Sequence, residues 1–391
     1  MSLQLPATTT RAALASGTAA VLLATIGLGP LLGPLAQPLI LLLVLPALGR
    51  SLAALGWGRR AAHLLRAGIG KTRRPVALFL VWCGVSALLT LDVAAVVAAD
   101  VGLEVARDDP RERSSQMRAA ILGSNFGSFL FPFSNLTNIV VVASLGISFG
   151  AYVMAALPIQ IAVIAMGVLL LGRNRPSALP TRSGVDRATT APQLERPSPL
   201  AANLAGLAAV AGSIAAIATG FLGGDVAPVF AVAAAIAAAC AVASGSAQPR
   251  SLARSIPVSG LLLLLAAIAA HGLIADVARG VGGGAWPVTP LNLLVVALIG
   301  GGLAAALNNL PAAIIGSVWL VGADIQIAMA FLIGTNVLAV ITPHGSLATM
   351  LSHAVAQARG WRISRSAYVR NAWRDALLAS GVALAALFVF H

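Results

Sequence analysis

Most of this chain consists of apolar stretches long enough to cross a lipid bilayer as helices. Hydrophobic residues make up 59% of the 391 residues, and charged residues only 9%. A water-soluble protein of this length needs a much larger polar surface, so we expect an all-α polytopic membrane protein whose first partner is the lipid bilayer. The net charge of +13 does not indicate nucleic-acid binding, because the 25 Lys and Arg residues lie between the apolar stretches and form no single patch.

The apolar stretches are of three kinds. Uninterrupted spanning helices are expected at 12–30, 34–55, 148–172, 200–222, 226–246, 256–278 and 375–390. Segments 117–145 and 325–356 carry Gly, Pro and polar residues in their middles, which predicts broken transmembrane helices. Segments 75–106 and 290–322 are too long for one span and have a polar or proline-containing tip, which predicts re-entrant helical hairpins. The sum is about nine spans plus two hairpins.

The positions of the basic residues predict the orientation. Five segments contain 23 of the 25 Lys and Arg residues, namely 50–74, 107–118, 173–199, 247–255 and 357–374. Cytoplasmic loops of membrane proteins carry such an excess, so we expect a cytoplasmic N-terminus, an external C-terminus and a location in the cytoplasmic membrane. The hairpin at 75–106 is then expected to open inward, and the hairpin at 290–322 outward.

An internal repeat agrees with this topology. Residues 121–138 (ILGSNFGSFLFPFSNLTN) align without gaps on residues 332–349 (LIGTNVLAVITPHGSLAT), which pairs Asn125 with Asn336. The hairpin tips align with Asp92 opposite Asn309. Repeats of inverted topology with broken helices are typical of secondary transporters, whose site lies near the bilayer midplane. We therefore expect a first half at 1–172, a cytoplasmic linker at 173–199 and a second half at 200–391.

Two motifs resemble a known family. "NNLPAAIIG" followed by "ITPHGSLATML", together with "FSNLTNIV", resembles the arsenite and antimonite efflux permeases of the ion transporter superfamily, which also contains sodium-coupled dicarboxylate carriers. The resemblance implies proton-coupled export of arsenite or a similar small metalloid solute by an elevator-like movement. As candidate partners it implies a cytoplasmic ATPase subunit, as in some arsenite pumps, and a second copy of the chain. The chain differs from that family at Leu91, where an Asn usually precedes the Asp, and in the uncharged run "TNVLAVITP".

The polar residues around the two breaks are the candidate substrate site. Their hydroxyls and carboxamides, with the amides and carbonyls freed by the breaks, would form a neutral cradle that suits a small polyhydroxyl solute. The alternative is that these side chains only bond nearby carbonyls and permit the kinks. The candidates are Asn125, Ser134, Asn135, Thr137, Asn138, Asn308, Asn309, Asn336, Thr342, Ser346 and Thr349.

Two ionisable residues are candidates for coupling to an ion gradient. Asp92 lies in an apolar hairpin tip, where a carboxylate must pair, bind a cation or take up a proton. His344 titrates near neutral pH, although its repeat-mate Phe133 favours a packing role. We expect a proton to be the coupling ion more than sodium. Cys83 and Cys240 form no metal-binding or disulfide pattern, so neither a metal nor another cofactor is expected.

Two other functions remain open at this stage. A sodium-coupled carrier of an organic anion would need positive or strongly donating groups, and the sequence places no Lys or Arg at the midplane. An intramembrane hydrolase using Ser346 and His344 would need an oxyanion-binding motif, and none is evident. The sequence therefore favours a transporter over an enzyme.

Overall fold

The computed structural model describes residues 29–71, 73–106, 110–173, 181–183, 198–247 and 286–390. The helices expected at 12–30 and 256–278 lie outside these ranges, apart from residues 29 and 30. Most of the linker expected at 173–199 also lies outside them.

The described residues are almost entirely helical. The first half contains α2 (Gly29–Ala54), α3 (Trp57–Gly68), α4 (Arg74–Leu89), α5 (Leu91–Val105), α6 (Pro110–Gly127), a 3₁₀ turn (Pro132–Ser134), α7 (Leu136–Leu145), α8 (Phe149–Gly172) and strand β1 (Thr181–Ser183). The second half contains α9 (Pro199–Phe221), α10 (Ala227–Ala243), α13 (Pro290–Leu307), α14 (Asn309–Trp319), α15 (Ile325–Asn336), a 3₁₀ turn (Leu338–Ile341), α16 (Leu347–Ala358), strand β2 (Trp361–Ile363) and α17 (Arg365–Phe390).

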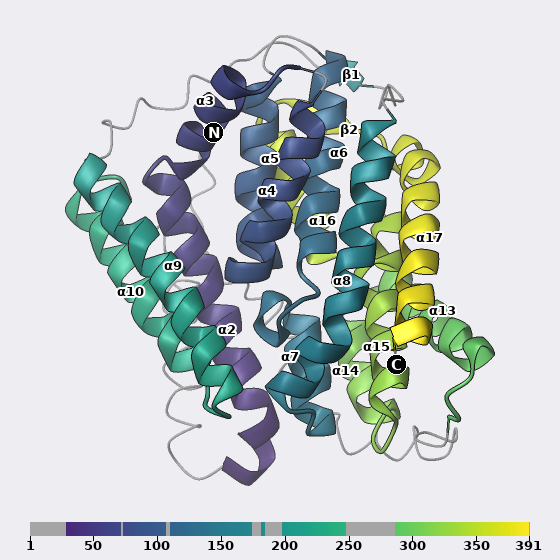
Figure 1. Ribbon diagram of the computed structural model, residues 1–391. Helices are drawn as coiled ribbons and strands as arrows, with labels where there is room; N and C mark the ends of the chain where they lie inside the picture. The colour runs from purple at the N-terminus through teal and green to yellow at the C-terminus, as the bar shows by residue number, and fades with distance from the viewer. Residues whose placement is uncertain are drawn as a thin grey trace, which may run out of the picture.

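The same series of elements occurs twice with opposite direction. A helical hairpin, a helix broken by a 3₁₀ turn and a long final helix are formed by α4–α8 and again by α13–α17. Figure 1 shows the α4–α5 hairpin in the upper half of the molecule and the α13–α14 hairpin in the lower half. The two hairpins therefore open toward opposite ends, and their tips lie near mid-depth.

Helices α2, α9 and α10 form a separate layer beside the two repeats (Figure 1). Small residues hold this layer together, because Ala202, Ala205 and Ala209 of α9 and Ala237 and Ala241 of α10 are buried in one cluster. Small side chains allow helix backbones to approach closely in a membrane. Through α2 this layer packs on α5 and α7.

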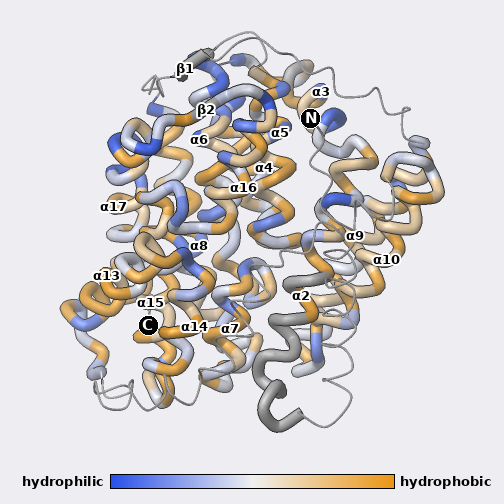
Figure 2. Tube along the Cα trace, turned by 180° about the vertical axis from the view of Figure 1, so that it is seen from behind, coloured by the Kyte–Doolittle hydropathy of each residue, from blue (hydrophilic) through white to orange (hydrophobic). Residues whose placement is uncertain are grey.

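The composition of the helix surfaces fits a bilayer. Helices α8, α9, α13 and α17 are each long and apolar enough to cross a membrane. Figure 2 shows hydrophobic residues along most of the helices and hydrophilic residues gathered around α3, β1 and β2, at the end that we call the basic end. With the inverted hairpins and broken helices, these features confirm the predicted fold class, an all-α polytopic membrane protein.

The basic end contains elements that the sequence did not predict. Helix α3 is amphipathic and lies within the segment expected to be a loop, because its apolar side packs on α5. Strand β1, within the expected linker, pairs antiparallel with β2, with Arg182 opposite Arg362. Helix α17 begins at Arg365, ten residues before the expected start, and its buried Asp375 is paired with Arg118 of α6.

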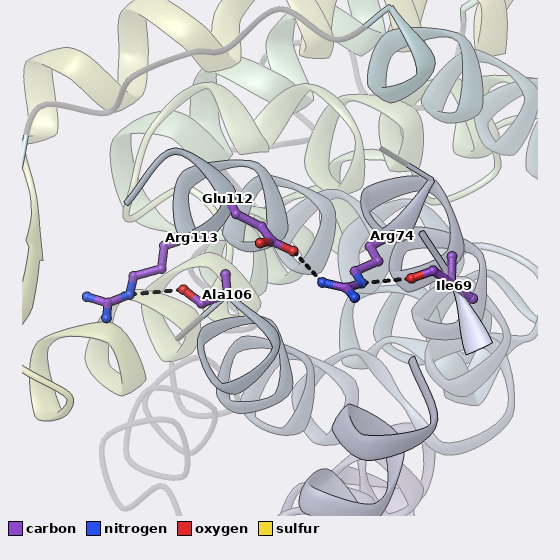
Figure 3. Close-up of polar contacts among 5 residues, drawn as sticks. All are labelled: Ile69, Arg74, Ala106, Glu112 and Arg113. Atoms are coloured by element: carbon purple, nitrogen blue, oxygen red, sulfur yellow. Dashed lines mark hydrogen bonds and ion pairs between the residues drawn. The ribbon is translucent and has the colours of Figure 1, made fainter. Parts of the chain in front are cut away.

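Polar contacts fix the open end of the α4–α5 hairpin (Figure 3). Arg74, at the start of α4, donates to the carbonyl of Ile69 at 2.8 Å and to the carboxylate of Glu112 on α6 at 3.0 Å. Arg113 donates to the carbonyl of Ala106, just after α5, at 3.2 Å. The arms of this hairpin are thus anchored to the start of the broken helix that follows it.

The structure corrects the predicted alignment of the hairpin tips by one residue. Thr90 and Asn308 each lie between the two arms of a hairpin, with φ of 129° and 95° and nearly equal ψ of 160° and 154°. A Cβ on Gly123 of α6 would lie 2.8 Å from the carbonyl oxygen of Phe79, and one on Gly334 of α15 would lie 2.1 Å from that of Ala297. Thr90 and Asn308 are separated by the same number of residues as Phe79 and Ala297. At that separation Asp92 corresponds to Leu310, and Leu91 to Asn309.

Candidate functional site

The first break is bonded to the second repeat through Asn336. The Oδ1 atom of Asn336 accepts hydrogen bonds from Thr137 Oγ1 at 2.6 Å and Asn135 Nδ2 at 3.1 Å. Its Nδ2 atom donates to Oδ1 of Asn138 at 2.7 Å. All four side chains are at most 2% exposed. We call these four residues the Asn336 clasp.

The second break is bonded to the first repeat in the equivalent way. Ser346 Oγ donates to Oδ1 of Asn125 at 2.6 Å, and Asn125 Nδ2 lies 3.5 Å from Thr349 Oγ1. These three side chains are also at most 2% exposed. We call them the Asn125 clasp. Since Asn125 aligns with Asn336, Ser346 with Asn135 and Thr349 with Asn138, the two clasps are related by the repeat.

The remaining candidates bond each break to its own hairpin. Ser134 donates to the carbonyl of Ala87 at 2.6 Å, near the end of α4. In the second repeat Asn308 donates to the carbonyl of His344 at 2.8 Å, and Thr342 to that of Ala305 at 3.3 Å. Asn309 Oδ1 accepts from the amide of Leu347 at 3.4 Å. The structure thus gathers the eleven candidate residues around the two breaks and bonds them to one another or to nearby backbone.

Four helices begin in this central region, at the hairpin tips and the breaks. Asn135 caps α7 by accepting from the amide of Thr137, and Asn308 caps α14 by accepting from that of Leu310. Helices α5 and α16 have no side-chain bond from their own N-cap residues, Thr90 and Ser346. The first amides of a helix and its dipole favour anions and oxygen ligands.

Asp92 lies in a cavity between the first repeat, the second break and the outer layer. This cavity of about 80 Å³ is lined by Asp92 of α5, Leu347 and Leu351 of α16, and Gly49 and Arg50 of α2, among others. Asp92 is 9% exposed, and its Oδ1 atom has no hydrogen-bond partner among the described residues. A buried polar atom without a partner is costly, so the carboxyl group is expected to take up a ligand, a cation or a proton.

The cavity around Asp92 contains a positively charged residue, Arg50, that the sequence did not predict there. From the sequence, Arg50 is expected in a cytoplasmic segment, and no base is expected at the midplane. The structure places it beside Asp92, because α2 and α5 approach closely: a Cβ on Gly49 would lie 2.9 Å from Val93. A positively charged residue therefore lines the cavity at the hairpin tip.

His344 is not a packing residue. Its side chain is exposed, whereas its repeat-mate Phe133 is buried and stacks on Phe131 at 5.3 Å between ring centroids. The hydroxyl of Ser346 donates to Asn125, so in this conformation it is not activated by His344. Within the described ranges, no group of three or more His, Cys, Asp or Glu residues could hold a metal ion.

Several polar residues that are wholly or partly buried were not predicted from the sequence. Arg118 of α6 makes a bidentate bond to Asp375 of α17, with both N–O distances 2.7 Å. Gln160 of α8 donates to the carbonyl of Phe126 and accepts from the amide of Phe129, before the first break. His353 of α16 was also missed. The partners of Arg118 and Gln160 lie outside their own helices, so no local sequence pattern indicated them.

Asp100 and Glu104 pair with a residue of the second repeat. Both are on α5 and contact the guanidinium of Arg359, just after α16. This ion pair joins the open end of the first hairpin to the second repeat. It lies at the basic end, away from the clasps.

Comparison with known proteins identifies the family. The model of the CitMHS family, described as citrate transporter, matches residues 6–343. The chain belongs to this family. The chain is also similar to the crystal structure of the YdaH transporter from Alcanivorax borkumensis, which was described as having an unusual topology, with a TM-score of 0.60 and 16% identity over 96% of this chain and 89% of that one. No curated protein matches the chain significantly.

Membership of the citrate transporter family confirms part of what the sequence predicted. The chain is a secondary transporter and a multi-pass membrane protein, and both the family and the structural neighbour are transporters, not enzymes. The narrower resemblance to arsenite permeases stays a prediction, as do the coupling ion, the roles of the candidate site residues and the orientation.

Proposed function

We propose that the chain carries a small organic polyanion of the citrate class, together with protons, across the cytoplasmic membrane. The observation that carries this proposal is the cavity at the first hairpin tip. There, Arg50 lies beside the N-termini of α5 and α16, neither of which is capped by its N-cap side chain. A guanidinium and two helix N-termini are strong donors to carboxylates. The family description, citrate transporter, points the same way.

Asp92 supplies the coupling in this proposal. Its carboxylate lines the same cavity as Arg50, so an ionised Asp92 would repel a carboxylate substrate. Uptake of a proton by Asp92 removes this repulsion and leaves the donors in place. Substrate and proton would then bind together, which is the basis of symport.

The movement is proposed to be elevator-like. The hairpins and broken helices are held together by the two clasps, whereas α2, α9 and α10 form a separate layer. The repeats would move as one body against that layer and expose the cavity alternately to each side. The basic end is proposed to be cytoplasmic, which puts the end of α17 outside.

Arsenite export is the second candidate. The observation that favours it is the neutral chemistry of the clasps, in which hydroxyls and carboxamides alone surround the breaks. Such groups suit an uncharged hydroxide such as As(OH)₃, and the motifs of the second repeat resemble the arsenite permeases. Proton-driven export would follow if this solute were the substrate.

Transport by the purified chain in proteoliposomes tests both candidates. We expect labelled citrate to accumulate with a pH gradient, and accumulation to stop when that gradient alone is collapsed, with no effect of the sodium gradient. Arg50→Gln should weaken citrate uptake, while Arg59→Gln, on the exposed surface of α3, should not. Transport of As(III) without citrate transport would replace the first candidate by the second. Dependence on sodium alone would contradict proton coupling.

A further inference from the structure

His353 lies in the middle of α16, one helical turn beyond Thr349 of the Asn125 clasp. Its Nδ1 atom is 2.7 Å from the carbonyl oxygen of Thr349, and its ring lies edge-on against Tyr368, with 5.0 Å between centroids. A carbonyl can only accept, so Nδ1 carries the hydrogen. The free lone pair of the neutral imidazole is therefore on Nε2.

The Nε2 atom of His353 is buried and has no hydrogen-bond partner in the part of the chain that the structure describes. Leaving such an atom unpaired costs free energy. The repeat symmetry does not require a polar residue at this position. At the offset that relates the two clasps, His353 corresponds to Val142, an apolar residue of α7. Imidazole is also the side chain that changes charge near neutral pH.

Tyr368 is held in place against His353 by its own hydroxyl, which donates to the carbonyl of Val340 at 2.8 Å. The ring contact therefore fixes the imidazole while its Nε2 atom stays unbonded among the described residues.

On the helices around α16, the acidic residues and Arg118 are paired elsewhere or face another side of α16. On α5, Asp100 and Glu104 contact Arg359, and Asp92 lies in the cavity lined by Leu347 and Leu351, on a different side of α16 from His353. On α6 and α17, Arg118 and Asp375 bond each other. Of β2, the described side chains are those of Trp361 and Ile363. His353 is thus a second ionisable position, separate from Asp92.

We propose that His353 is a proton-binding residue of the transport cycle. The Nε2 lone pair accepts the proton to give imidazolium, and loss of the same proton restores the neutral ring. No other bond changes. The positive charge then lies one turn from Thr349 and favours an anion at the clasp. The inference rests on the proposed proton-coupled function.

Uptake measured between pH 5.5 and 8.5 in proteoliposomes tests the role. His353→Gln keeps a polar side chain without a titrating group, and His353→Phe keeps a ring against Tyr368. We expect both variants to lose most of the pH dependence of citrate uptake but to retain citrate counterflow, which needs no gradient. His63→Gln, on exposed α3, is the matched control and should keep the wild-type profile. Tyr368→Phe, which keeps the aromatic ring, should also keep the wild-type pH profile.

A measurement without transport separates this inference from the proposed function. With ¹³Cε1-labelled histidine, the NMR signal missing from His353→Gln belongs to His353. We expect that signal to titrate within pH 5.5–8.5 and its midpoint to rise when citrate is added, since linkage is reciprocal. A wild-type pH profile in both variants, loss of counterflow in both, or a signal that never titrates would overturn the proposal. Absence of any citrate effect in the wild type, with the signal still titrating, would count against citrate as substrate and leave His353 as a proton-binding residue.

Discussion

The two hairpin tips have the same backbone and opposite chemistry. Thr90 and Asn308 adopt the same unusual conformation between the two arms. Two residues later, the first hairpin carries Asp92, which lies in a cavity with one carboxylate oxygen unpartnered in the described structure, whereas the second carries the apolar Leu310. Asn308 is bonded to the second break, while the hydroxyl of Thr90 is buried without a described partner.

This difference separates residues that stabilise the fold from residues that are needed for coupled transport. The features present in both repeats, namely the clasps and the close approach of Gly123 and Gly334 to the hairpins, hold the helices together. The ionisable groups Asp92 and His353 each occur in one repeat only. We therefore expect changes at repeated positions to affect stability first, and changes at unrepeated positions to affect coupling first.

The largest expected effect concerns the sidedness of the hairpins. In a background without Cys83 and Cys240, Lys71→Cys at the foot of the first hairpin should label only from the cytoplasmic side. Val288→Cys, before the second hairpin, should label only from outside, because the two hairpins open at opposite ends. Both positions are exposed. Labelling of both with an impermeant thiol reagent from one side would contradict the inverted arrangement.

Asp92→Asn should abolish gradient-driven transport. The amide resembles the protonated carboxyl group, so substrate binding and counterflow should survive while coupling to the pH gradient is lost. The control is Asp100→Asn, which removes an acid on the same helix that pairs with Arg359 at the basic end. Wild-type accumulation of citrate and of As(III) by Asp92→Asn, with unchanged pH dependence, would rule out a coupling role.

The two clasps should differ in their contribution to stability. Asn336→Ala removes three hydrogen bonds to buried side chains, whereas Asn125→Ala removes a short bond to Ser346 and a long one to Thr349, and each buried group left unsatisfied costs about 1–3 kcal/mol. We expect the larger decrease in thermal stability for Asn336→Ala. Asn203→Ala, which removes an exposed acceptor of Arg60, should have almost no effect. Equal decreases in thermal stability would mean that the number of hydrogen bonds in a clasp does not determine its contribution to stability.

A double substitution tests whether the clasps form one substrate site. Asn135→Ala and Thr349→Ala should each weaken substrate binding by roughly 2- to 13-fold, from about 0.5–1.5 kcal/mol per hydrogen bond. Because they belong to different clasps, their effects on unfolding should add. Their effects on binding, measured by thermal stabilisation with citrate or As(III), should not add if both clasps contact one ligand. Additive effects on binding would indicate that the two breaks are only hinges and that the clasps do not contact one ligand.

The smallest expected effect concerns the strained tip residues. Thr90→Gly should stabilise the chain by about 1 kcal/mol, because it removes backbone strain and a buried hydroxyl without a described partner. Asn308→Gly should not, because it also removes the bonds from Asn308 to the second break and to the first turn of α14. Thermal unfolding in detergent measures both, and destabilisation by Thr90→Gly would show that the conformation at Thr90 is not strained.

Much of this architecture was predictable from the sequence, and the exceptions have physical causes. The Asn125–Asn336 alignment predicted the breaks correctly, because Pro and Gly occur there together with several polar residues, whereas Pro158 alone does not interrupt the apolar helix α8. The hairpin tips were misaligned by one residue, because the tip is set by a backbone conformation that Thr90 and Asn308 share despite different side chains. Arg50, at the end of the helix expected at 34–55, was counted with the cytoplasmic segment 50–74, since its position near Asp92 depends on helix packing that no local pattern records.

The clasps also affect when the chain can complete its folding during synthesis. The Asn135 and Asn336 side chains that bond each other are 201 residues apart, and those of Asn125 and Ser346 are 221 apart. At ribosomal speeds of about 5–20 residues per second, the first half must wait roughly 10–40 s in the membrane before its partner for Asn135 is synthesised. During that interval its carboxamides and hydroxyls have no symmetry-related partner. A chaperone or insertase that shields polar transmembrane segments would therefore act on the first half alone, and premature release would expose it to degradation.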